Sequence, residues 1–265
     1  MVEEIPFSHI ASASLYYVVE DGPAQIRLKF RWIEFMVSQE HVSANLTRAQ
    51  IIDAVTASAN LQIRKDIPGL VAFISRWCAD THTVVCRWGE MTFSLKSVAL
   101  LLNLTVTRNL NIQLTEDEEK MRATLVAKSK DFVRRENEKC FYSWWVSQWF
   151  PDELDPSQKN STLHVAAFLV LWLSRDVFDD GSSKKKIRQE LLMIAIKLDK
   201  GVVLPIGSLF LGSLYTHLDH LVADMRVSNG YMKVDLYVHV TFLQAWLWEH
   251  FEKYASKPLP SLPAN

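Results

Sequence analysis

The sequence is poor in cysteine, has no excess of either charge, and contains no apolar run long enough to cross a membrane. Cys78, Cys86 and Cys140 are too few and too far apart for a disulfide framework, so we expect a reducing compartment, the cytosol or the nucleus. Lys and Arg number 29 against 30 Asp and Glu, which gives no general attraction to nucleic acid or anionic lipid. The longest apolar run, residues 163–173, is about half a membrane span, and the first residues lack a signal-peptide pattern. We therefore expect neither membrane insertion nor secretion.

Glycine and proline are also scarce, with 8 and 9 residues, whereas hydrophobic residues make up 49% of the chain. This composition excludes a disordered or fibrous protein and predicts a large core. Most of the 9 Trp and 13 Phe must be buried, which favours helices packed through wide aromatic side chains. We predict a mostly α, compact fold of about nine or ten helices with one short β-hairpin.

We predict a single domain over residues 1–255, followed by a disordered tail at 256–265. Residues 152–160 are the best candidate for a polar linker, which leaves open two lobes, 15–150 and 161–253, within that domain. The hydrophobic periodicity predicts helices near 26–38, 47–58, 66–78, 94–102, 115–135, 144–149, 162–177, 184–199, 206–225 and 235–253.

Three of these helices begin with capping signals. Asp66 precedes an Ile-Pro step, Ser94 precedes an apolar periodic segment, and Thr115 with Glu118 has the spacing of a capping box. The helix after Thr115 has an acidic first turn and an expected i,i+4 ion pair between Glu118 and Arg122.

The periodicity changes between Asp66 and Ser94. β-Branched and aromatic residues fill 81–88, Gly89-Glu90 follows, and residues 91–93 resume the pattern. We therefore predict a β-hairpin near 82–93 with its turn at Gly89-Glu90.

Two blocks of sequence, in the same order, resemble a known family. The blocks comprise Trp77, 81–83 and 89–102, then 168–178, 180–183, 209–215 and 243–251. They resemble the plant mobile domain, a family also labelled aminotransferase-like and met in transposable elements, and the resemblance covers roughly residues 15–252. The motif residues are Trp77, Thr81, His82, Thr83, Gly89, Glu90, Met91, Thr92, Leu95, Trp246, Trp248, Glu249, His250 and Phe251. The chain departs from the pattern at Asn103, where Gly is common, and at Ile206-Gly207, where Trp-Gly is common.

This resemblance implies a nuclear protein similar to the maintenance-of-meristems proteins. Those proteins act in transposon silencing, genome stability and meristem maintenance beside a phosphoprotein phosphatase-like partner. The family brings no catalytic activity and no cofactor. The residues agree, because no pyridoxal phosphate site, phosphate-binding glycine loop or nucleophile elbow is legible in the sequence.

Two groups of residues suggest chemistry, and each has a plainer structural interpretation. Cys78, His82 and Cys86, with Cys140 as a fourth ligand, offer soft zinc ligands, but small buried cysteines are common in ordinary cores. A metal or acid–base cluster could gather the following residues, which are otherwise partly buried, hydrogen-bonded side chains: His217, Asp219, His220, His239 and His250. We expect Glu249 and His250 to satisfy each other beside Trp246 and Trp248.

Two groups of residues are candidates for binding. Partly exposed tryptophans would anchor a protein interface, and the candidates are Trp88, Trp144, Trp145 and Trp149. The basic run Lys184, Lys185, Lys186 and Arg188 lies at a predicted helix start, where it would contact nucleic acid or form a solvated loop end. The first hypothesis is a non-enzymatic interaction module, the second a nucleic-acid-binding remnant of a mobile element, and the third an enzyme built on the histidine cluster.

Overall fold

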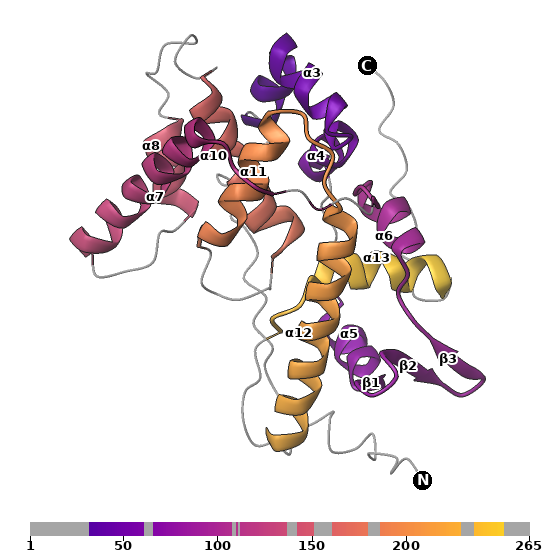
Figure 1. Ribbon diagram of the computed structural model, residues 1–265. Helices are drawn as coiled ribbons and strands as arrows, with labels where there is room; N and C mark the ends of the chain where they lie inside the picture. The colour runs from indigo at the N-terminus through magenta and orange to yellow at the C-terminus, as the bar shows by residue number, and fades with distance from the viewer. Residues whose placement is uncertain are drawn as a thin grey trace, which may run out of the picture.

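The computed structural model describes residues 32–60, 66–107, 110, 112–136, 142–150, 161–179, 186–228 and 236–251 (Figure 1). These residues are mostly helical, as predicted, with one small β-sheet. Residues 32–38 are helical. The further α-helices are α3 (Glu40–Arg48), α4 (Ile52–Asn60), α5 (Ile67–Ile74), α6 (Leu95–Leu102), α7 (Glu116–Glu136), α8 (Tyr142–Trp149), α10 (Thr162–Trp172), α11 (Leu192–Asp199), α12 (Ile206–Ser228) and α13 (Val240–His250). No described helix combines the length and hydrophobicity needed to cross a membrane.

The sheet has three antiparallel strands in the order β1 (Trp77–Cys78), β2 (Thr83–Cys86) and β3 (Gly89–Met91). Two details differ from the prediction. The turn lies at Arg87-Trp88, because Cys86 pairs with Gly89. Gly89 therefore follows the turn instead of forming its centre. Its φ is +145°, a conformation that residues with a side chain rarely adopt. In addition, α5 ends at Ile74 and the chain continues into β1, where we had expected more helix.

The three capping signals are confirmed. An Asp66 carboxylate oxygen accepts from the amide three residues later at 3.1 Å, and the Ser94 hydroxyl does the same at 3.1 Å. The Thr115 amide donates to Glu118 at 2.7 Å, and the Glu118 amide donates to the Thr115 hydroxyl at 3.4 Å. Asn103 ends α6 in the left-handed conformation, which glycine and asparagine tolerate best, and this accounts for its taking the place of the family's glycine.

Several other boundaries and pairs were predicted wrongly. α3 occupies a segment that we had predicted to lie between two helices. Gln39, which we had predicted to end the helical structure, instead separates residues 32–38 from α3. Residues 186–188 are not helical, and α11 is preceded by a short 3-10 turn at Gln189–Leu191. Arg122 pairs with Glu119, three residues away, because Glu118 is directed into the core.

The helical core is centred on α10, which is buried on nearly its whole circumference and continues into a π-helical turn at Leu173–Val177. A helix that is apolar all round must be enclosed by other elements, and α10 packs most extensively against α11. α7 and α8 also contact α10. The long helix α12 extends from this region to the sheet, where α5 and α13 lie (Figure 1). The buried apolar side chains of both regions belong to one cluster. The predicted linker and tail lie outside the described residues, and the division into lobes stays a prediction.

One ion pair is buried between α7 and α11. Lys197 Nζ lies 2.7 Å from Glu118 Oε2, and the two side chains are only 11% and 9% exposed. Burial acts to raise the pKa of Glu118, but the hydrogen bonds from Lys197 and from the Thr115 amide outweigh it, so this pKa lies below its ordinary value. The carboxylate therefore stays charged at neutral pH and joins the first turn of α7 to α11.

Replacing Lys197 with Met should destabilise the protein by about 3 kcal/mol, because it leaves a buried carboxylate without its cation. Urea unfolding at neutral pH measures this free energy. The matched control is Lys120→Met, which removes an exposed i,i+3 pair with Asp117 and should cost less than about 1 kcal/mol. Equal effects of the two substitutions would contradict a structural role for the buried pair.

Candidate interaction groove

Asp219 on α12 fastens the first strand and the following loop to the helix. One carboxylate oxygen accepts the indole N–H of Trp77 at 2.7 Å, and the other lies 3.1 Å from Nε2 of His82. Trp77 is buried, whereas Asp219 and His82 remain partly accessible. A buried indole N–H without an acceptor is costly, so this carboxylate stabilises the position of β1.

Tyr215, one helical turn before Asp219, makes a second attachment to the sheet. Its hydroxyl donates to the Phe93 carbonyl at 2.6 Å and lies 3.0 Å from the Thr92 hydroxyl. Thr92 in turn donates to the His82 carbonyl at 2.6 Å. The His82 ring stacks on Tyr215, with centroids 5.1 Å apart and planes at 13°. His82 has φ +51°, a left-handed conformation that these contacts hold.

Phe93 lies at the centre of an aromatic cluster that joins the sheet to α5 and α13. Its ring centroid is 4.9 Å from that of Trp246, 5.7 Å from Trp77 and from Phe242, and 6.2 Å from Phe73. Most of these rings meet edge to face, the favoured geometry for aromatic pairs. The cluster, defined by these five residues, fixes the distance between α5, β1 and α13.

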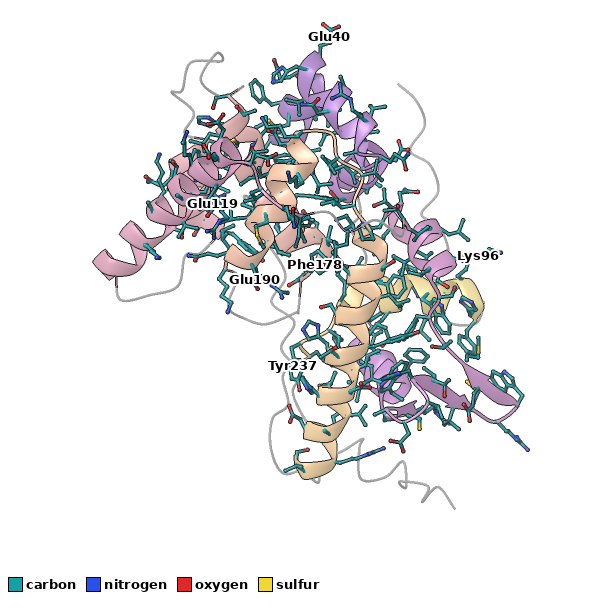
Figure 2. All side chains as sticks on the ribbon, in the orientation of Figure 1. Glu40, Lys96, Glu119, Phe178, Glu190 and Tyr237 are labelled. Atoms are coloured by element: carbon teal, nitrogen blue, oxygen red, sulfur yellow. The ribbon has the colours of Figure 1, made fainter. Side chains whose placement is uncertain are left out.

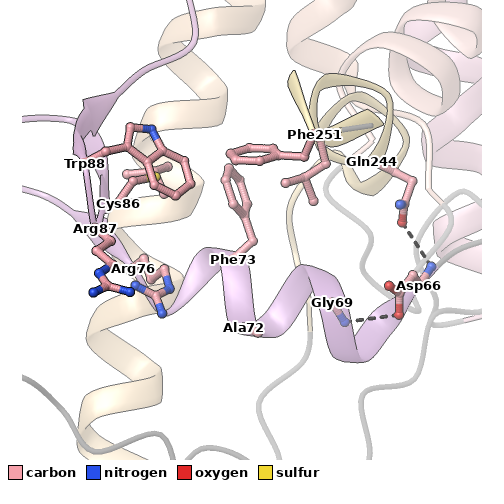
Figure 3. Close-up of a pocket in the computed structure, with 12 residues that line it drawn as sticks. Asp66, Gly69, Ala72, Phe73, Arg76, Cys86, Arg87, Trp88, Gln244 and Phe251 are labelled. Carbon is pink, nitrogen blue, oxygen red and sulfur yellow. Dashed lines mark hydrogen bonds between the residues drawn. The ribbon is translucent and has the colours of Figure 1, made fainter. Parts of the chain in front are cut away.

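A groove with a cavity of about 350 Å³ lies next to this cluster and shares Phe73 with it (Figure 3). α5, the sheet and α13 form its walls. Apolar side chains make most of its surface, among them Phe73, Val84 and Leu247. Trp88 and Phe251 face each other across it, with ring centroids 6.1 Å apart. The Trp88 side chain is 72% exposed, so a large apolar surface is held in solvent at the mouth of the groove.

The polar lining residues lie at the two ends of the groove. At one end Gln244, which is buried, accepts from the Asp66 amide at 3.0 Å, and the Asp66 side chain caps α5. At the other end Arg76 and Arg87 lie together beside Trp88 (Figure 3). The lining thus carries positive charge next to the exposed tryptophan and a hydrogen-bonded carboxyl group at the opposite end.

The four candidate interface tryptophans have different environments. Trp88 is exposed, in agreement with the expectation, and Trp144 is half-buried. The prediction of partial exposure was wrong for Trp145 and Trp149, which are 0% and 1% exposed. Trp145 donates its indole N–H to the Ala167 carbonyl of α10 at 2.9 Å. These two residues bind α8 to the core and are not available to a partner.

The structure separates the residues of the two proposed chemical clusters. His82 contacts Asp219, whereas Cys86 lines the groove, and Cys140 lies outside the described residues. His217 lies edge-on to Tyr237, a residue beside α12 (Figure 2). Within the described ranges, no group of three or more His, Cys, Asp or Glu side chains is placed to hold a metal ion.

Two further histidines of the proposed cluster, His239 and His250, make contacts with α13. His239 caps the helix, accepting from the Phe242 amide at 3.1 Å. His250 does not pair with Glu249 as expected, since its Nδ1 lies 2.8 Å from the Trp246 carbonyl and its ring stacks on Trp246 at 4.0 Å. Both histidines therefore have structural contacts of their own.

The family-motif residues gather around the sheet and α13. Thr83 donates to Glu90 across β2 and β3 at 2.8 Å, and the Thr81 and Thr83 hydroxyls are 2.7 Å apart. Met91, in β3, is partly buried against the core, and Leu95 begins α6. Trp248 is partly buried. From the sequence we placed Asp219 only in a metal or acid–base cluster and did not predict its hydrogen bond with Trp77.

The basic run is only partly described, since Lys184 and Lys185 lie outside the described residues. Lys186 is half-buried. Arg188 contacts Glu190 at 2.9 Å through Nε and donates to the Phe178 carbonyl at 3.0 Å through Nη1. Its guanidinium group therefore makes hydrogen bonds to other residues of the same chain.

Comparison with protein families gives one match. The sequence model of the family described as plant mobile domain matches residues 50–263. No curated protein and no solved structure matches the chain. The matched range includes α5, the whole sheet, α12 and α13, and hence every described residue that lines the groove.

Replacing Asp219 with Ala should destabilise the protein by about 2 kcal/mol, because the buried Trp77 indole loses its acceptor. Asp219→Asn keeps one carbonyl oxygen for Trp77 and should cost less than half as much. Urea unfolding followed by tryptophan fluorescence compares the variants. If alanine and asparagine cost the same small amount, the hydrogen bond does not hold the sheet.

Proposed function

The chain belongs to the plant mobile domain family, and we propose that it is a non-catalytic protein-interaction module that binds its partner in the groove between α5, the sheet and α13. The observation that carries this proposal is the 72% exposure of Trp88 at the mouth of an apolar cavity. Tryptophan is among the residues that contribute most to binding energy at protein interfaces. A free protein has little other reason to hold an indole in water beside a hydrophobic groove.

The groove is held in shape before any partner arrives. Trp88 occupies the two-residue turn between β2 and β3. The first strand of this sheet, β1, is attached to α12 through Asp219, and the segment after β3 is attached through Tyr215. Phe251, opposite Trp88, directly follows α13, which the aromatic cluster joins to the same sheet. Binding to a pre-formed site loses less conformational entropy than binding to a mobile loop, which supports a dedicated binding surface.

The polar groups of the groove support binding more than catalysis. Among the lining residues, the carboxyl group of Asp66 caps a helix and Gln244 supports the backbone next to it. Cys86 is the one nucleophilic side chain in the lining, and none of the lining residues is a histidine. A thiol nucleophile is usually activated by an adjacent base, so this lining lacks a readable catalytic pair.

The cellular role is part of the same proposal, and membership of the family supports it. The module works in a nuclear complex that acts in transposon silencing, genome stability and meristem maintenance. A phosphoprotein phosphatase-like protein is its proposed partner. The alternative is a nucleic-acid-binding remnant that uses residues 184–188. The described part of this run does not favour it, because Arg188 contacts the Phe178 carbonyl, and the net charge of −1 gives no general attraction to phosphate.

Replacing Trp88 with Ala should weaken partner binding by about 30-fold, the effect of losing an interface residue worth about 2 kcal/mol. Affinity purification of the full chain from plant nuclei, with quantitative mass spectrometry, measures the loss of the recovered proteins. Val227→Ala is the matched control, because Val227 is an exposed apolar residue at the end of α12. Recovery of the same proteins in the same amounts with Trp88→Ala would contradict the proposal.

A further inference from the structure

We infer that the groove binds a short acidic peptide segment, in which one bulky apolar side chain enters the cavity beside Trp88 and neighbouring Asp or Glu side chains contact the Arg76 and Arg87 end. This inference rests on the proposed function and names the chemistry of the partner at the same site. It concerns one occupant, a linear segment of a partner protein.

The size and lining of the cavity determine which apolar side chain of the peptide can bind. About 350 Å³ accommodates one or two large side chains, and the surface around it is mainly aromatic and aliphatic. Trp88 and Phe251 face each other across the mouth, so an entering aromatic or leucine side chain would contact both rings and Phe73 beneath them. Burying one such side chain strengthens binding by about 10- to 150-fold.

The two arginines of the lining determine the charge of the peptide that the groove prefers. Both Arg76 and Arg87 are exposed, and both lie at the sheet end of the groove next to Trp88 (Figure 3). Guanidinium groups bind carboxylates through paired N–H donors. At the other end the Asp66 carboxyl group would repel a second acidic residue. The charge distribution therefore orients the peptide, with its acidic residues toward the hairpin turn.

The same distribution disfavours a nucleic acid as occupant. A nucleic-acid groove needs a row of cations that follows successive phosphates. The described lining has only Arg76 and Arg87, both at one end, and a carboxyl group at the other. A single acidic cluster next to an apolar anchor matches this lining better than an extended polyanion.

Selection from a phage-displayed library of random short peptides on the immobilised full chain tests the inference. The recovered peptides should be enriched in a pattern of one aromatic or leucine residue next to Asp or Glu. Their binding should fall by about tenfold or more with Trp88→Ala and with Arg87→Glu. Lys96→Glu is the control, because it makes the same charge change on α6 at a residue that does not line the groove.

A charge-reversal cycle with one recovered peptide separates specific contact from general attraction. Exchanging the peptide's acidic residues for Lys should abolish binding to the unaltered chain and restore part of the binding to Arg87→Glu. Recovery of basic or proline-rich peptides, or equal losses with Arg87→Glu and Lys96→Glu, would overturn the inference. If Trp88→Ala still weakens binding of the natural partner in that case, the proposed function stands and only the peptide chemistry is wrong. If Trp88→Ala weakens binding of neither the partner nor a peptide, the groove itself is not the binding site.

Discussion

The position of the groove depends on one carboxylate. Asp219 accepts a hydrogen bond from the buried Trp77 indole and contacts His82, so that a strand of only two residues is held against a long helix. A three-stranded sheet this small buries too little surface to be stable alone and needs packing against a helix. α12 provides that support through Asp219 and Tyr215, and it also packs against α6.

The aromatic cluster extends this attachment to the other walls of the groove. Phe93 contacts rings from α5, β1 and α13, so the three elements that enclose the groove share one packing centre. The residue before it, Thr92, hydrogen-bonds to the His82 loop, and the residue after it, Ser94, caps α6. The first family block thus combines an anchor, a packing centre and a helix start within three residues. Trp88 is presented to solvent as a consequence of this arrangement.

Local signals in the sequence predicted the fold better than they predicted the site. Asp66, Ser94 and Thr115 were readable because a cap bonds within its own turn. The bond between Trp77 and Asp219 spans 142 residues, and no periodicity reports such a contact. Trp145 and Trp149 lie in a short aromatic helix, and only the packing of α8 on α10 decides that they are buried. The turn was misplaced because Gly89 follows it at φ +145°, a position that composition does not distinguish from the turn centre.

Amide hydrogen exchange of Asp219→Ala, compared with the unaltered chain, tests most directly whether this carboxylate holds the groove in shape. The account predicts that exchange accelerates more in residues 77–91, which carry Trp77 and Trp88, than in α10 and α11. Unchanged exchange in 77–91 would show that the sheet is held by other contacts, and a uniform increase over the whole chain would show that Asp219 supports global stability alone. Either result would contradict the central claim.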